Sequence, residues 1–209
     1  KIDNPSQWGS DHTGGWQFIS SPFVDANIDN FVPSDTDYDL FKYDGTQELQ
    51  WVNHKIHGTD FDATFQQGRG YLASYEADTT AMFSGILNNE RTHTFHDIEA
   101  YDNEDYYRNF YLLGNPFPFN MNWSNMSVSG VYNGYATISS EDGSYDYHAS
   151  GTINVGDGFM VETTDATPNL TYTHNVRKAN EKLESIDIMA ANIYGCDNTI
   201  VRLAGEEEV

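Results

Sequence analysis

Cysteine is almost absent from this sequence of 209 residues, which contains a single one, Cys196. No disulfide can therefore form within the chain, and cysteine usage leaves the redox compartment open. Long apolar runs are missing as well, because no stretch reaches the roughly 18 consecutive apolar residues of a membrane-spanning helix. The sequence therefore predicts no membrane span.

Basic residues are scarce: 10 lysines and arginines stand against 32 acidic residues, which gives a formal net charge of −22. So acidic a chain repels phosphate backbones, and a nucleic acid is not an expected partner. Aromatic residues, in contrast, make up 14% of the chain. Disordered chains are poor in aromatic residues, so the charge does not indicate disorder, and aromatic side chains pack well on strands.

Helical periodicity is nearly missing too, and short alternating or apolar runs separated by turn residues replace it. The predicted strands cover residues 16–20, 38–43, 70–75, 80–87, 110–113, 130–135, 158–162 and 169–173. This texture predicts an all-β, antiparallel, jelly-roll-like β-sandwich, with helix in less than about a tenth of the chain. We expect the core to contain Trp16, Phe18, Leu40, Tyr71, Phe83, Leu112, Phe159, Val161 and Tyr172.

An internal repeat is the most informative feature of the sequence. A predicted strand that ends in Pro-Phe occurs twice, at residues 15–23 and 110–117. A Gly-x-Gly-aromatic turn that enters a strand follows in both copies, at residues 68–71 and 156–159. Chance similarity between β-rich segments is the alternative, but the preserved order of the elements favours duplication.

The repeat and a change of composition suggest the domain organisation. We predict one β-sandwich module over residues 1–175, built from two duplicated halves, at about 15–90 and 110–175, whose sheets close on one core. Residues 176–209 are predicted to be a linker and the first strands of a following β domain, because two strands cannot close a core alone. The alternative is that these strands extend the edge of the first domain.

Five segments carry a resemblance to a known family. They are GWQFISSPF at 15–23, YDLFKYD at 38–44, WVNHK at 51–55, GRGYLA at 68–73 and LLGNPF at 112–117. Together they resemble a β-rich module that recurs in large exported proteins of Bacteroidetes, beside adhesin-like or protease domains and ahead of a type IX secretion sorting domain. The resemblance implies a secreted or outer cell-surface protein, and it carries no catalytic residues.

This resemblance covers about residues 15–203. The sequence DNTIVRL at 197–203 is similar to the start of the domain that follows in that family, with Asn198 where the family usually has Arg.

Motifs of known catalytic chemistry are missing. The sequence has no Gly-x-Ser-x-Gly elbow and no His-Glu-x-x-His motif. Its Gly-x-Gly turns lack the lysine and the helix of a phosphate-binding loop. The pairs His54/His57 and His93/His96 are expected to be surface histidines, because a transition-metal site needs about three or four converging ligands. The sequence therefore predicts that the chain is not an enzyme.

Calcium is the one cofactor that the sequence suggests. Asp25, Asn27 and Asp29 alternate with the spacing of the first half of an EF-hand loop, but Asn30 and Thr36 replace its Gly and Glu. Hard cations bind oxygen-rich loops of this kind, so we expect a structural calcium ion at these three residues. Solvated loop acids without an ion are the alternative.

Two tryptophans suggest a binding function. Trp51 and Trp123 each lie among polar residues, which suggests exposed side chains. Exposed aromatic rings of this kind can stack on sugar rings. One hypothesis is a non-catalytic adhesion, interaction or spacer module that contacts host or matrix proteins, glycans and neighbouring domains of its parent chain. The alternative is a carbohydrate-binding module accessory to a glycan-degrading enzyme, with Trp51 and Trp123 as its ligand-binding residues.

Overall fold

The fold is described from a computed structural model over residues 15–32, 37–57, 61–76, 80–96, 98–174, 186–192 and 195–201. The chain forms two compact units, Lys1–His174 and Asn175–Val209. In the second unit, β14 (Ile186–Asn192) and β15 (Gly195–Val201) pair with each other as an antiparallel hairpin.

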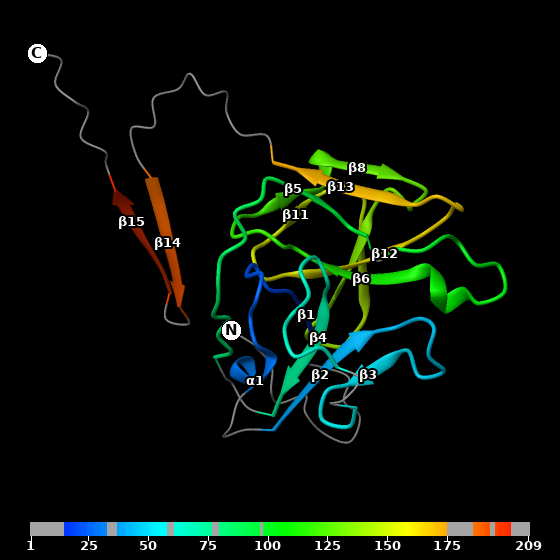
Figure 1. Cartoon of the computed structure of the whole chain (residues 1–209), viewed down its shortest axis with the longest axis horizontal. Coiled ribbons are helices and arrows are strands. Elements are labelled where there is room, and N and C mark those ends of the chain that lie inside the picture. The colour runs from blue at the N-terminus through cyan, green and yellow to red at the C-terminus, as the bar shows by residue number, and fades with distance from the viewer. Residues whose placement is uncertain are drawn as a thin grey trace, which may run out of the picture. The chain divides into compact units, whose positions relative to one another are not determined.

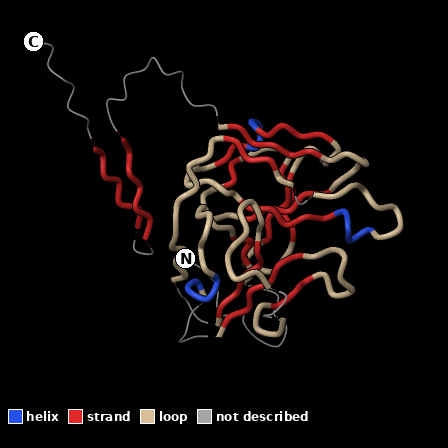
Figure 2. The backbone as a smooth tube through the Cα atoms, viewed as in Figure 1, coloured by secondary structure: helices blue, strands red, loops and turns tan. Residues whose placement is uncertain are grey.

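The first unit is all-β, and every strand pair in it is antiparallel, which confirms the predicted fold class (Figures 1 and 2). Its strands are β1 (Gln17–Ile19), β2 (Tyr38–Tyr43), β3 (Trp51–Asn53), β4 (Tyr71–Tyr75), β5 (Thr92–Thr94), β6 (Phe110–Gly114), β7 (Met121–Asn122), β8 (Met126–Ser129), β9 (Tyr135–Ile138), β10 (Tyr145–His148), β11 (Thr152–Ile153), β12 (Gly158–Glu162) and β13 (Asn169–Thr173). The helices are short: α1 (Ile28–Phe31) and the 3-10 helices η2 (Tyr106–Asn109) and η3 (Trp123–Asn125). None of the helices in the described ranges is long and apolar enough to cross a membrane.

Two four-stranded sheets repeat one topology. The first sheet has the strand order β1-β4-β2-β3, and the second, read in the same direction, has the order β6-β12-β9-β10. Numbered along the chain, the first of the four strands of each sheet pairs with the fourth, the fourth with the second and the second with the third.

The strand register repeats as well. Phe18 pairs with Leu72 in the first sheet, and Leu112 pairs with Met160 in the second. These are the positions that the Pro-Phe and Gly-x-Gly segments align in the sequence, so the repeat found in the sequence is also a repeat of structure.

The two halves hold each other through reciprocal contacts. The Ser20 backbone N–H, just after β1, donates to the carbonyl oxygen of Gly156 at 2.8 Å. At the equivalent positions of the other half, the Gly114 N–H donates to the carbonyl oxygen of Gly68 at 2.8 Å. Each Gly-x-Gly turn is therefore bound by the first strand of the opposite half, which relates the halves by an approximate two-fold axis.

Three apolar clusters alternate with the sheets, where the sequence predicted one core. Successive side chains of a strand point to opposite faces, so each four-stranded sheet contributes to two clusters. Between the two sheets lies a cluster of four buried side chains, Phe18, Leu72, Leu112 and Met160, which we call the central cluster. The outer face of the first sheet packs against α1 and nearby loops, and that of the second sheet against β13, β8 and the segments around them. The prediction of one core was wrong because both faces of these strands are apolar.

Most of the predicted core residues are buried. Trp16 and Phe83 are only partly buried, and both pack against the edge of a cluster. The predicted strand at 80–87 is wrong, because these residues form a loop that is joined to Phe23 by a single bridge at Leu87. The residues found buried are Phe18, Leu40, Tyr71, Leu112, Phe159, Val161 and Tyr172.

Truncations at equivalent positions of the central cluster test the repeat. Phe18→Ala and Leu112→Ala should each lower the free energy of unfolding by about 2–5 kcal/mol, because each opens a cavity between the same two sheets. Met82→Ala is the control, since Met82 is 71% exposed, and it should change stability by less than about 0.5 kcal/mol. Urea unfolding measures all three, and losses below about 1 kcal/mol at both cluster positions would contradict this packing.

The two Gly-x-Gly turns allow a second matched comparison. Gly68 and Gly156 have φ of 78° and 86°, which disfavours any side chain. A Cβ on Gly68 would also collide with the His93 imidazole, whereas a Cβ on Gly156 would only meet the Ser20 carbonyl oxygen at 4.0 Å.

Gly68→Ala should therefore be more destabilising than Gly156→Ala, by about 1 kcal/mol or more beyond the shared backbone strain. In a His93→Ala background this difference should shrink, because the colliding ring is gone. If both substitutions lower the free energy of unfolding equally in the natural background, the His93 ring does not clash with a methyl group at position 68.

Candidate ligand-binding site

A cavity of about 360 Å³ is lined by residues of both four-stranded sheets and of the loops beside them. Seven of its lining residues are aromatic, and we call it the aromatic cavity. The lining consists of Tyr43, Gln50, Trp51, Tyr107, Phe110, Tyr132, Gly134, Ala136, Tyr145, Tyr147, Met160, Val161 and Glu162. Its volume is in the range of sites that hold small molecules or a few sugar units.

The floor of the aromatic cavity follows from the strand register of the second sheet. Ala136 pairs with Tyr147 on one side and with Met160 on the other. Residues paired in this way share one face of a sheet, here the face toward the first sheet. The small side chain of Ala136 therefore leaves room between two larger neighbours.

The first sheet fills the corresponding position with a large side chain. Phe41 pairs with Leu72 as Ala136 pairs with Met160. The Phe41 ring packs against Trp16, with ring centroids 5.8 Å apart. The hollow on this side of the central cluster therefore lies where the second half has Ala136 and the first half has Phe41.

Trp51 forms the wall that the first sheet supplies. Its ring stacks on Phe18 with centroids 6.4 Å apart, and Tyr43 meets it edge-on at 5.0 Å. The Tyr43 hydroxyl donates to the Tyr107 carbonyl oxygen at 3.0 Å, which ties η2 to this wall. Trp51 is partly buried and is held in one orientation by these contacts.

Four tyrosines form the rim. Tyr107, Tyr132 and Tyr145 are each 54% exposed, and Tyr147 is 62% exposed. A tyrosine hydroxyl is protonated at neutral pH, and partial burial raises the pKa of Tyr145 further, so this hydroxyl can donate a hydrogen bond. The rim therefore combines ring faces with hydroxyl donors and acceptors.

The two sequence-predicted tryptophans have different positions. Trp51 lines the aromatic cavity, whereas Trp123 is 3% exposed and lies in the outer cluster of the second sheet. Asn122 caps η3 by accepting a hydrogen bond from the Ser124 N–H at 3.0 Å, and this tight turn carries Trp123 into the core. The Trp123 ring offers no face to a sugar, so that part of the predicted site is corrected.

The predicted calcium residues each have a local structural role. The Asp25 carboxylate accepts from the Ile86 N–H at 2.6 Å, and Asn27 caps α1. Asp29 is exposed, with its carboxylate 3.9 Å from Nε2 of His54. Among the described residues, no three His, Cys, Asp or Glu side chains form a group that could hold a metal ion. Calcium binding at Asp25, Asn27 and Asp29 stays a prediction.

Thermal unfolding tests the calcium prediction. An ion bound to these residues in the native state alone would raise the melting temperature as calcium increases, and Asp29→Asn would reduce that rise. Melting curves that coincide in millimolar calcium and in a chelator would refute the prediction.

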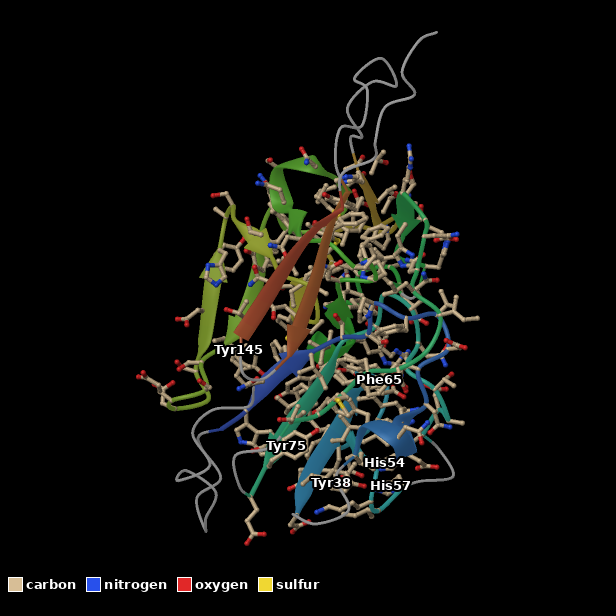
Figure 3. All side chains as sticks on the ribbon, turned by 90° about the vertical axis from the view of Figure 1, so that its left-hand side faces the viewer. Tyr38, His54, His57, Phe65, Tyr75 and Tyr145 are labelled. Carbon is tan, nitrogen blue, oxygen red and sulfur yellow. The ribbon has the colours of Figure 1, made fainter. Side chains whose placement is uncertain are left out.

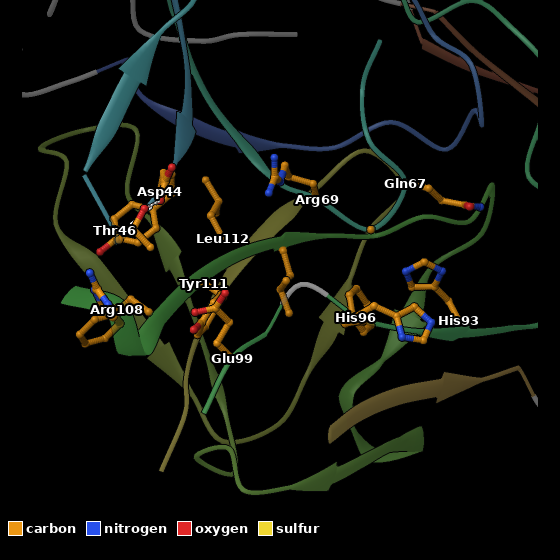
Figure 4. A pocket seen from close by; sticks show the side chains of 16 residues that line it. Asp44, Thr46, Gln67, Arg69, His93, His96, Glu99, Arg108, Tyr111 and Leu112 are labelled. Carbon is orange, nitrogen blue, oxygen red and sulfur yellow. Dashed lines mark hydrogen bonds between the residues drawn. The ribbon is translucent and has the colours of Figure 1, made fainter. Parts of the chain in front are cut away.

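A second cavity, of about 410 Å³, is polar and is shown in Figure 4. His93, His96, Arg69 and Arg108 line it, together with Glu99. Both arginines form ion pairs with acidic neighbours: Arg69 lies 3.5 Å from the Asp62 carboxylate and Arg108 lies 3.3 Å from that of Asp105. The His93 ring packs edge-on against Phe95 at 4.8 Å. Arg69, Arg108 and His93 therefore each contact other parts of the fold.

The other predicted histidine pair also lies apart from the aromatic cavity. His54 and Tyr38 are labelled in Figure 3, and His54 Nδ1 is 3.1 Å from the Tyr38 hydroxyl. The His54 ring also packs edge-on against Phe61, with ring centroids 5.0 Å apart. Burial lowers the pKa of His54, although the nearby Asp29 carboxylate opposes this effect. His57 is exposed, as predicted for a surface histidine.

No protein-family model, curated protein or solved structure matches this chain. The function of the chain is therefore inferred from the residues of the aromatic cavity.

Proposed function

We propose that the chain is a non-catalytic binding module of a secreted or cell-surface protein, and that it holds a glycan in the aromatic cavity. The observation that carries this proposal is the position of Trp51, whose ring forms one wall of a cavity rimmed by four exposed tyrosines. The resemblance to exported Bacteroidetes modules and the net charge of −22 are in keeping with an extracellular setting.

Sugar rings suit a site of this chemistry. A pyranose has apolar faces of C–H groups that pack on aromatic rings, and hydroxyls around its edge that need hydrogen-bond partners. The aromatic cavity supplies ring faces from Trp51 and the tyrosines, and polar atoms from the tyrosine hydroxyls, Gln50 and Glu162. Mostly apolar lining with a few polar groups is the usual composition of small-ligand sites.

The same residues favour binding over hydrolysis. Glycoside hydrolysis ordinarily uses two carboxylates on opposite sides of the scissile bond. Glu162 is the one carboxylate among the described residues that line the aromatic cavity. A module that holds a glycan without cleaving it fits both hypotheses from the sequence. It could act in adhesion to glycans, or as a carbohydrate-binding module accessory to a glycan-degrading enzyme.

Filling the cavity is the sharpest test of the proposal. Ala136→Phe gives the second sheet a phenylalanine at the position that is equivalent to Phe41 in the first sheet. It should block the cavity while the chain still folds, as a melting curve would verify. Glycan-array binding that the natural chain shows should then fall by roughly tenfold or more, a loss of about 1.4 kcal/mol.

Two further variants separate the ring contacts from the fold. Tyr147→Ala removes an exposed rim side chain and should weaken glycan binding without lowering stability, whereas Leu49→Ala, 79% exposed and outside the lining, should change neither. An array on which no glycan binds, or binding that Ala136→Phe leaves intact, would refute the proposal. Binding of matrix proteins alone would favour adhesion to proteins instead.

A further inference from the structure

Glu162 is the charged residue of the aromatic cavity, and its surroundings are unusual for a carboxylate. It ends β12, where it pairs with Phe110, and its backbone carbonyl oxygen accepts from the Tyr132 N–H at 2.9 Å. In the described part of the chain its side chain has no hydrogen bond and no ion pair, and neither lysine nor arginine lines the cavity. No residue in the described ranges therefore provides this carboxylate with a counter-ion.

Burial beside aromatic rings is unfavourable for this negative charge. Burial raises the pKa of Glu162, and no neighbouring charge or hydrogen bond offsets the effect. The faces of the Trp51, Tyr145 and Tyr147 rings are also electron-rich, so they attract cations and repel anions. Both the carboxylate and the rings would therefore be stabilised by a positive group inside the cavity.

We propose that the ligand of the aromatic cavity is an amino sugar, whose ammonium group lies between the Glu162 carboxylate and the aromatic ring faces. This inference rests on the proposed glycan-binding function and specifies the class of glycan. The cavity volume of about 360 Å³ exceeds what the tip of a lysine side chain needs, and the rim hydroxyls and Gln50 suit the remaining sugar hydroxyls. The net charge of −22 would also draw a positively charged polysaccharide toward the chain.

Three oligosaccharides that differ only at C2 of each ring test the inference. They are the β-1,4-linked hexamers of glucosamine, N-acetylglucosamine and glucose, which carry an ammonium, an acetamide and a hydroxyl group. Calorimetric titration of the natural chain at a mildly acidic pH, where the C2 amines are protonated, should give roughly tenfold tighter binding of the glucosamine hexamer than of the other two. Glu162→Gln should remove this preference and leave the binding of the neutral hexamers within about twofold.

Control variants distinguish binding at Glu162 from the general electrostatic attraction between a polycation and an acidic chain. Glu141→Gln removes an equal charge from the exposed β9–β10 turn, outside the cavity lining, and should keep the preference. Ala136→Phe should weaken all three hexamers alike. A preference that Glu162→Gln and Glu141→Gln reduce equally would overturn the inference.

The remaining outcomes separate this inference from the proposed function. Equal affinity of the natural chain for all three hexamers would overturn the amino-sugar assignment while glycan binding stands. No binding of any hexamer or of any arrayed glycan would reject both. A lysine-rich peptide that binds as tightly as the glucosamine hexamer, with the same loss in Glu162→Gln, would overturn the sugar assignment in favour of a protein ligand.

Discussion

The packing of one four-stranded sheet against the other is the interaction on which the rest of this module depends. Four buried side chains, Phe18, Leu72, Leu112 and Met160, fill the space between the sheets, and each belongs to a pair of equivalent positions. Burying such a side chain contributes about 1.5–3 kcal/mol. Because each half also binds the Gly-x-Gly turn of the other, neither sheet can move without breaking contacts in both.

The aromatic cavity is a local departure from this symmetry. Where Phe41 completes the packing in the first half, Ala136 in the second half leaves a hollow, and Trp51 closes it from the opposite sheet. The wall of the cavity is rigid because Trp51 stacks on Phe18, a member of the central cluster. A preformed wall reduces the entropy lost when a ligand binds, which favours recognition by stacking.

The sequence was sufficient to predict the fold class and the repeat. Strand texture and the recurring Pro-Phe and Gly-x-Gly segments fall on equivalent strands and turns, because these residues end strands and permit positive φ. The number of apolar clusters was not predictable from one half considered alone. Both faces of β4 and β12 are largely buried, and only the arrangement of both halves and the outer segments shows that each face is covered.

The candidate site was harder to predict, because its residues come from separate strands and loops. The polar neighbours of Trp51 indicated an accessible ring, and Trp51 does line the aromatic cavity, but the same signal was misleading at Trp123, where a capped 3-10 turn directs the ring inward. The rim tyrosines and Glu162 gave no local signal, since their proximity depends on tertiary packing. The spacing of Asp25 and Asn27 suggested a cation site, but both side chains bond to nearby backbone N–H groups.

A crystal structure of the chain with a bound oligosaccharide would show most directly whether the aromatic cavity is the binding site. We expect a sugar ring stacked on the Trp51 side chain, within about 4 Å of it, with hydroxyls directed toward the rim tyrosines. An oligosaccharide bound in the polar cavity beside His93 and Arg108, or on another face of the module, would contradict it.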